Sequence, residues 1–241
     1  MSLLEGIKPL MTPFRSAFNR LHPEGLPFVL IGFVAAILCL LLGAGTLGGV
    51  FFVLTLYVVY FFRDPARMTP VLPGAVISPA DGVVTAIERT PPPEELEMGD
   101  APMLRISIFL SVLNVHVNRI PADGRIARLV YVPGKFLNAT LDKASKDNER
   151  QLVRLDRPDG SSIAFVQIAG LIARRIVCKL ETGQEVRAGE RFGIIRFGSR
   201  MDVYCPAGLE PRLTLGQTAI GGETVLAAPP GVAVPTESRM S

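Results

Sequence analysis

An apolar stretch without a charged residue occupies positions 27–62 and limits what this chain can fold into. It divides into two runs, 27–44 and 47–62, around a Gly-rich segment at 43–49. As an α-helix each run would be about 24–27 Å long, close to the ~30 Å core of a bilayer. A chain of 241 residues cannot bury so continuous an apolar segment in a soluble core. We therefore expect residues 1–62 to form a membrane-associated region whose two apolar runs make a helical hairpin.

The residues that flank the apolar runs predict the orientation of the hairpin. Arg15 and Arg20 precede it, and Arg63 and Arg67 follow it. Basic residues favour the cytoplasmic side of the cell membrane, so both ends of the hairpin and the following domain are expected to face the cytoplasm. A single tilted or re-entrant element is the alternative. A cleaved signal peptide does not fit, because the apolar stretch is too long and begins too late.

The composition argues against several other classes of protein. The net charge is +3, with 25 basic and 22 acidic residues, which does not predict nucleic-acid binding but suits an anionic membrane surface. The chain has three cysteines, without a C-x-x-C pair, and two histidines. These numbers predict neither a disulfide framework nor a His/Cys metal site, and they fit a reducing compartment.

Residues 63–241 predict a mainly β domain, either barrel-like or sandwich-like, because short apolar runs recur between turn residues. The expected strands are 76–77, 82–87, 104–110, 125–132, 151–155, 163–168, 174–180, 191–196, 201–204 and 224–227. The segments SPADGVVTAIE (78–88) and LETGQEVRAGERFGIIRFGS (180–199) resemble the two halves of a biotinyl/lipoyl-type β hammerhead. The polar segment 138–150 is expected to be helical, and the tail after Ala228 is expected to be disordered.

Three polar side chains could carry chemistry: Asp81, His116 and Ser199. Each alone has an ordinary explanation, since Asp-Gly and Gly-Ser pairs are common in turns and a histidine can be half-buried in a strand. Together they supply the carboxylate, imidazole and hydroxyl of a base-activated nucleophile. The G-x-S-x-G elbow of ordinary hydrolases is missing. Gly198, directly before Ser199, instead leaves the peptide carbonyl sterically open to attack.

Six segments, in order along the chain, carry a specific resemblance. They are FFRDPARMTP (61–70), ISPADG (77–82), NVHVNRIPADG (114–124), PGKFLNATLDKASKDNER (133–150), VQIAGLIARRI (166–176) and GERFGIIRFGSRMDVYCP (189–206). The ordered set resembles the short, membrane-associated form of phosphatidylserine decarboxylase. The N-terminal apolar hairpin fits the same family.

The resemblance implies a carboxy-lyase that processes itself and needs neither a metal nor a diffusible cofactor. Ser199 would attack the carbonyl of Gly198, with His116 as base and Asp81 orienting His116. The cut would yield a β chain, 1–198, and an α chain, 199–241, which remain together as a heterodimer. Ser199 would become a covalent pyruvoyl group, whose ketone forms a Schiff base with phosphatidylserine and releases phosphatidylethanolamine.

The sequence also gives weaker predictions for substrate-binding residues and two alternative functions. Lys135 and Arg150 are candidates for binding the lipid substrate. Longer members of the family have a histidine where this sequence has Leu113, so His116 or water would deliver the proton in decarboxylation. One rival is a membrane-anchored lipoyl/biotinyl-like binding module, although the turn at 197–201 lacks the lysine that such a module modifies. The other is a membrane serine hydrolase, which would leave the chain intact.

Overall fold

The computed structural model describes residues 21–134, 147–170, 175–196, 199–232 and 237–241. The chain divides into two compact units, Met1–Ala66 and Arg67–Ser241. The predictions for Lys135, for Gly198 and for a helix at 138–146 lie outside the described residues.

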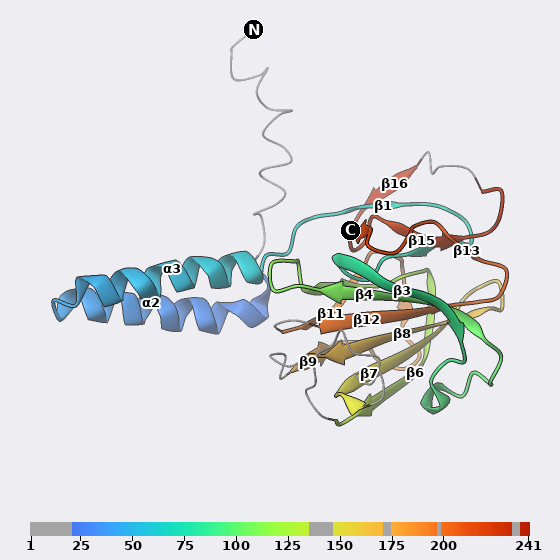
Figure 1. The fold of residues 1–241 in the computed structure, drawn as a ribbon, viewed down its shortest axis with the longest axis horizontal. Coiled ribbons are helices and arrows are strands. Elements are labelled where there is room, and N and C mark those ends of the chain that lie inside the picture. The colour runs from blue at the N-terminus through green and yellow to red at the C-terminus, as the bar shows by residue number, and fades with distance from the viewer. Residues whose placement is uncertain (1–20, 135–146, 171–174, 197–198, 233–236) are drawn as a thin grey trace, which may run out of the picture. The chain divides into compact units, whose positions relative to one another are not determined.

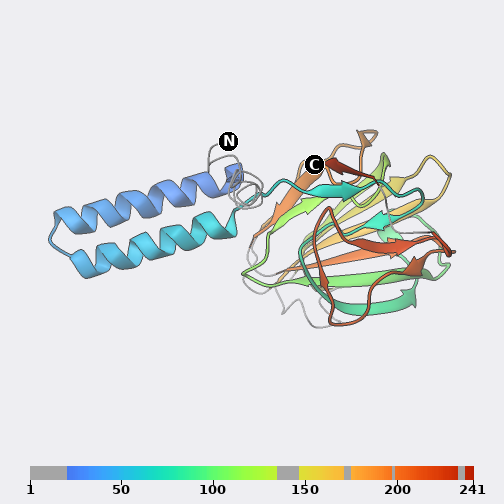
Figure 2. The same ribbon diagram turned by 90° about the horizontal axis from the view of Figure 1, so that it is seen from above.

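The first unit is a pair of antiparallel apolar helices that lie side by side (Figures 1 and 2). A short 3-10 helix, η1 (Pro23–Gly25), leads into α2 (Leu26–Leu41), and α3 (Gly45–Phe61) follows. The turn between them contains Gly43 with a φ of +78°, a left-handed conformation that glycine adopts without a steric penalty. The helices pack through small residues, since a Cβ added to Gly32 would collide with Thr55 and one added to Gly48 would crowd Ala36 and Leu40.

The outer surfaces of this hairpin carry large apolar side chains. Ile31, Leu41 and Leu42 are 68%, 78% and 83% exposed. Among the described residues, Pro23–Leu41 is long and apolar enough to cross a membrane, judged by length and composition, whereas Gly45–Phe61 is shorter. An exposed apolar surface of this kind marks an interaction site and suits contact with lipid.

The second unit consists mainly of antiparallel strands, which together with the helical N-terminal segment confirms the predicted fold class. Its largest part is a curved sheet with the strand order β10-β6-β7-β8-β12-β4-β3-β14 (Figure 1). These strands are β3 (Gly82–Thr90), β4 (Met103–Leu110), β6 (Gly124–Val132), β7 (Arg150–Asp156), β8 (Ser162–Ala169), β10 (Glu185–Val186), β12 (Ser199–Cys205) and β14 (Thr218–Ala219).

Three smaller sheets complete the second unit in the described part of the chain. Their orders are β5-β11-β9, β13-β15-β2 and β1-β16. The strands are β1 (Met68–Pro70), β2 (Val76–Ile77), β5 (Val117–Arg119), β9 (Ile176–Cys178), β11 (Arg191–Ile195), β13 (Glu210–Pro211), β15 (Val225–Ala228) and β16 (Ser238–Met240); a 3-10 helix, η2 (Glu94–Leu96), precedes β4. One buried cluster joins the large sheet to β2, β11 and β15, and within it the ring of Phe165 in β8 meets that of Phe192 in β11.

Strand β12 lies between β8 and β4 in the large sheet, and all seven of its residues are buried. Because side chains alternate along a strand, its residues divide between two faces. Met201, Val203 and Cys205 enter the main core, whereas Tyr204 joins a second cluster on the other face. Strand β12 is therefore buried on both faces.

Two expectations about local structure are wrong. Arg150 begins strand β7, so the expected helix does not extend to that residue. The tail after Ala228 is not disordered throughout, because Ser238–Met240 forms β16 and pairs with β1. Its low hydrophobicity gave no signal for a strand, but Arg239 donates a hydrogen bond to Asp123, 116 positions earlier, and that partner could not be read from the tail itself.

Candidate active site

Ser199 and Asp81 lie at the same end of strand β4, on either side of it. Ser199 begins β12 and is paired with Leu110, the last residue of β4. On the other side of β4, Val83 of β3 is paired with Phe109, and Asp81 lies two residues before Val83. Neighbouring strands are ~4.8 Å apart, which places these two backbone positions about 10 Å from one another.

His116 reaches the same end of the sheet through a turn that follows β4. The side chain of Asn114 closes this turn by accepting hydrogen bonds from the backbone N–H and the hydroxyl of Ser111, both 2.8 Å long. Ile195 then donates a backbone hydrogen bond of 3.4 Å to the carbonyl of His116. Ile195 ends β11, the strand that directly precedes the Gly198–Ser199 bond, so His116 lies beside the chain that leads to this bond.

The hydrogen bond of the His116 ring determines which nitrogen can act as a base. Nδ1 lies 2.9 Å from the carbonyl oxygen of Asn114. A carbonyl oxygen only accepts hydrogen bonds, so Nδ1 carries the hydrogen and donates it. In the neutral ring Nε2 therefore holds the lone pair that can take a proton. The whole residue is buried, with 0% of its surface exposed.

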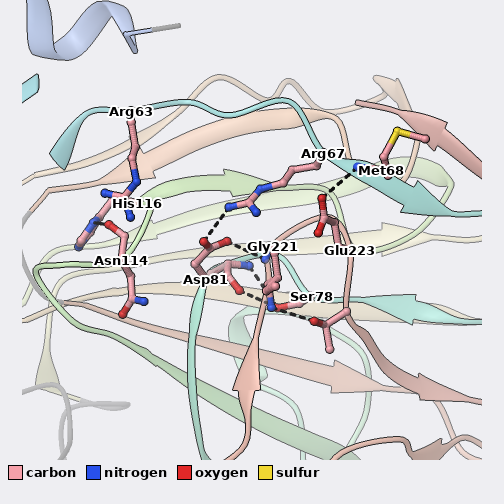
Figure 3. Close-up of polar contacts among 12 residues, drawn as sticks. Arg63, Arg67, Met68, Ser78, Asp81, Asn114, His116, Gly221 and Glu223 are labelled. Atoms are coloured by element: carbon pink, nitrogen blue, oxygen red, sulfur yellow. Dashed lines mark hydrogen bonds and ion pairs between the residues drawn. The ribbon is translucent and has the colours of Figure 1, made fainter. Parts of the chain in front are cut away.

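Asp81 connects three segments of the second unit (Figure 3). One carboxylate oxygen accepts a hydrogen bond of 2.7 Å from the guanidinium of Arg67, and the other accepts one of 2.8 Å from the backbone N–H of Gly221. The preceding turn is closed by Ser78, whose hydroxyl donates to the carbonyl of Ala80. The hydrogen bonds in Figure 3 thus connect Asp81 with Arg67 and Gly221, and His116 with Asn114. The orientation of His116 by Asp81 stays a prediction.

The hydroxyl of Ser199 is the most unusual polar group of the site. Ser199 is fully buried, and its Oγ has no hydrogen-bond partner within the described part of the chain. A buried hydroxyl without a partner costs free energy, and such exceptions in a folded protein call for a functional explanation. A reactive nucleophile next to a strand end is one such explanation.

The remaining predicted residues are placed away from an obvious substrate role. Arg150 is largely buried, and its guanidinium donates to Glu95 at 3.2 Å, so its role in lipid binding stays a prediction. Leu113 lies in the turn after β4 and is 59% exposed. In the described ranges no three His, Cys, Asp or Glu side chains are grouped so that they could hold a metal ion.

Two features of the site were not predicted from the sequence. Arg67 was expected to flank the hairpin, and its ion pair with the carboxylate of Asp81 was not predicted. Arg200 and Asp202 form a fully buried ion pair directly after Ser199. The signal for the second was present, because two opposite charges two positions apart interrupt an otherwise apolar strand and must share one face.

Comparison with known proteins places this arrangement in a family. The model of the phosphatidylserine decarboxylase family matches residues 54–227. A phosphatidylserine decarboxylase proenzyme of Paramagnetospirillum magneticum is 59% identical over 209 residues, which cover 86% of each chain. The proenzyme of Ruegeria pomeroyi is 58% identical over 207 residues, covering 86% of this chain and 94% of the relative. That of Gluconacetobacter diazotrophicus is 51% identical over 233 residues, covering 94% and 99%.

The chain therefore belongs to the phosphatidylserine decarboxylase family, a family of decarboxylases. The match extends from α3 to β15 and includes Asp81, His116 and Ser199. The family predicted from the six sequence segments is confirmed. These relatives are named as proenzymes, that is, precursors that are processed.

Proposed function

We propose that this chain converts phosphatidylserine to phosphatidylethanolamine with a pyruvoyl group that it makes from Ser199. The observation that carries the proposal is the buried Ser199 hydroxyl, which has no partner among the described residues and lies at the end of the sheet that also holds Asp81 and His116. Relatives named as decarboxylase proenzymes support both the reaction and a processing step.

Self-cleavage would begin with proton transfer from the Ser199 hydroxyl to Nε2 of His116. The oxygen of Ser199 attacks the carbonyl carbon of Gly198, and the peptide C–N bond breaks as its nitrogen takes up a proton. The ester so formed loses the Cα proton and breaks its Cβ–Oγ bond, which frees the carboxylate of Gly198. Addition of water to the remaining dehydroalanine and loss of ammonia leave a pyruvoyl group at the start of the α chain.

The protein supports this sequence by excluding water and by holding the reacting groups. His116 and Ser199 are both fully buried, so the proton transfer takes place in a region of low dielectric constant. Asp81 is proposed to orient His116 and to hold the turn before β3 through Arg67 and Gly221. Once formed, the ketone supplies Schiff-base chemistry with the amine of the lipid and withdraws electrons as CO₂ leaves.

The apolar hairpin would bring this chemistry to its lipid substrate. Its large exposed apolar side chains fit a bilayer, and the basic residues on either side of it favour the cytoplasmic face of the cell membrane. We propose that the hairpin inserts into the membrane and that the β unit works on the cytoplasmic side.

Replacement of the predicted nucleophile tests the function directly. We expect purified protein to show two chains on a denaturing gel, with an α chain whose intact mass corresponds to residues 199–241 carrying a pyruvoyl group. Ser199→Ala should give one unprocessed chain without decarboxylase activity. Ser162→Ala, at the start of β8, is the matched control and should be processed normally. An uncut wild-type chain that still releases CO₂ from phosphatidylserine would contradict the proposal.

A further inference from the structure

A fully buried ion pair directly follows the predicted nucleophile in strand β12. Nε of Arg200 donates to one carboxylate oxygen of Asp202 at 2.6 Å, and Nη2 donates to the other at 3.0 Å. Nη2 also donates to the hydroxyl of Ser107 in β4 at 3.0 Å. The side chains of Arg200 and Asp202 are only 3% and 1% exposed. We call these three residues the Arg200 cluster.

Stability alone does not account for the Arg200 cluster. Removing two charges from water costs several kcal/mol for each ion, and apolar residues of similar volume often stabilise a fold equally well or better. A bidentate pair between a guanidinium and a carboxylate does, however, fix the geometry of both groups. The cluster therefore fixes the backbone position of residue 200. Its side chains lie on the face of the sheet opposite to the side chain of Ser199.

Cleavage between Gly198 and Ser199 would place residue 200 next to the new end of the α chain. Residue 199 would lose its covalent link to the β chain and become the first residue of the α chain. A pyruvoyl group has a ketone in place of the backbone nitrogen, so residue 199 could no longer donate a hydrogen bond to the sheet. The first backbone N–H of the α chain would then belong to Arg200.

We propose that Arg200 is a positioning residue that clamps the new end of the α chain and thereby holds the ketone in place. Asp202 belongs to the same α chain and fixes the guanidinium. Ser107 would belong to the β chain, so its hydrogen bond to Arg200 joins the two products of cleavage next to the reactive group. This proposal rests on the proposed function, because it assumes the cut and the pyruvoyl group.

The test removes both charges at once to avoid leaving one of them buried and unpaired. We expect Arg200→Met/Asp202→Leu to be processed and to show the pyruvoyl mass, but to have a kcat about 10- to 100-fold lower with a nearly unchanged KM, because a displacement of ~1 Å at a reacting group costs on this order. Its ketone should form an oxime with hydroxylamine several-fold faster than in the wild type, as followed by intact mass.

A second ion pair in the same sheet provides a matched control. Arg154 and Asp156 in β7 have the same spacing, and Nε of Arg154 donates to Asp156 at 2.8 Å. Asp156 is paired with Ser162 at one end of β8, whereas Ser199 is paired with Ala169 at the opposite end. Arg154→Met/Asp156→Leu should therefore leave kcat and the rate of oxime formation unchanged.

The milder variant Ser107→Ala decides the outcome if the double variant is not processed. It removes only the hydrogen bond between the two chains, and we expect it to be processed and to lower kcat several-fold. Wild-type kcat and oxime rate in a processed variant of the Arg200 cluster would overturn the proposal, and so would an equal loss in the Arg154 control. Absence of a pyruvoyl group from the wild type would instead overturn the proposed function.

Discussion

Nε2 of His116 is the nitrogen available as a base because the carbonyl of Asn114 holds the hydrogen of the ring on Nδ1. The backbone carbonyl of Asn114, two residues away, thus sets the tautomer, and the orientation of the ring by Asp81 stays a prediction. A local contact of this kind is preserved when other residues of the site are replaced. Substitution of Asp81 should therefore change the site less than substitution of His116.

His116→Ala should slow self-cleavage by about 10²–10⁴-fold, the usual contribution of a general base. The fraction of uncut precursor, measured over time on a denaturing gel, provides the rate. The sequence has one other histidine, His22, which accepts a hydrogen bond from the N–H of Glu24 at the start of η1. His22→Ala is therefore the control and should be processed at the normal rate. Normal processing of His116→Ala would exclude this histidine as the base.

The residue types of the site could be predicted from the sequence, but their partners could not. Ser199, His116 and Asp81 stand in recognisable motifs, and the family resemblance assigns each of them a role. The contacts of Asp81 join residues 14 and 140 positions away, Arg67 and Gly221. Such contacts depend on which strands become neighbours, and a local pattern does not contain that information.

Among the structural elements, the longer strands and the hairpin followed from periodicity and composition. The apolar runs predicted α2 and α3, and a glycine in a left-handed conformation ends the first of them as the Gly-rich segment suggested. The two-residue strand β2 was predicted, but other strands of two or three residues, such as β10, β14 and β16, were not. They are too short for a detectable alternation of side chains, and each depends on hydrogen bonds with a partner strand that is distant in the sequence: β10 on β6, β14 on β3 and β16 on β1.

Strand β16 is expected to detach in acid. Burial tends to raise the pKa of Asp123, but hydrogen bonds from the Arg239 guanidinium and the Ala188 N–H outweigh it and hold that pKa below its ordinary value. A carboxyl group of this kind stabilises the fold above its unfolded pKa of ~3.9 and loses that contribution as the pH falls through the lower folded value. Hydrogen exchange at Ser241, whose N–H donates to Arg67, should therefore lose protection below about pH 4.

Replacement of the carboxyl group checks the origin of this pH dependence. Asp123→Asn should weaken the protection of Ser241 at neutral pH and remove its further loss in acid. Asp159→Asn is the control, because the lowered pKa of Asp159 comes first from its hydrogen bonds with Ser161 and not from β16. Unaltered acid-dependent exchange in Asp123→Asn would show that another group is responsible.

In the molecule as a whole, the inner strand β12 of the large sheet would belong to the α chain, the smaller of the two proposed cleavage products. Strand β12 forms ladders with β8 on one side and with β4 on the other. Its core side chains Met201, Val203 and Cys205 are completely buried, and burial raises the pKa of the Cys205 thiol to about 12. The α chain is therefore part of the main core and not an appendage to it.

Cleavage should leave the two chains firmly associated. We expect the processed protein in detergent to elute from a size-exclusion column as one species, at the volume of the uncut Ser199→Ala variant. The chains should separate only in denaturant, since separation would expose β12 and the faces of β4 and β8 that it covers. Release of the α chain in native buffer would contradict this expectation.

The place of β12 in the sheet also bears on the order of events during synthesis. Residues of the hairpin leave the ribosome before the β unit, and β12 is translated after both of its neighbours, β4 and β8. If the hairpin inserts into the membrane as proposed, it can do so while the β unit is still incomplete. The unfinished sheet would meanwhile expose unpaired edges on β4 and β8, and exposed edges of this kind favour aggregation.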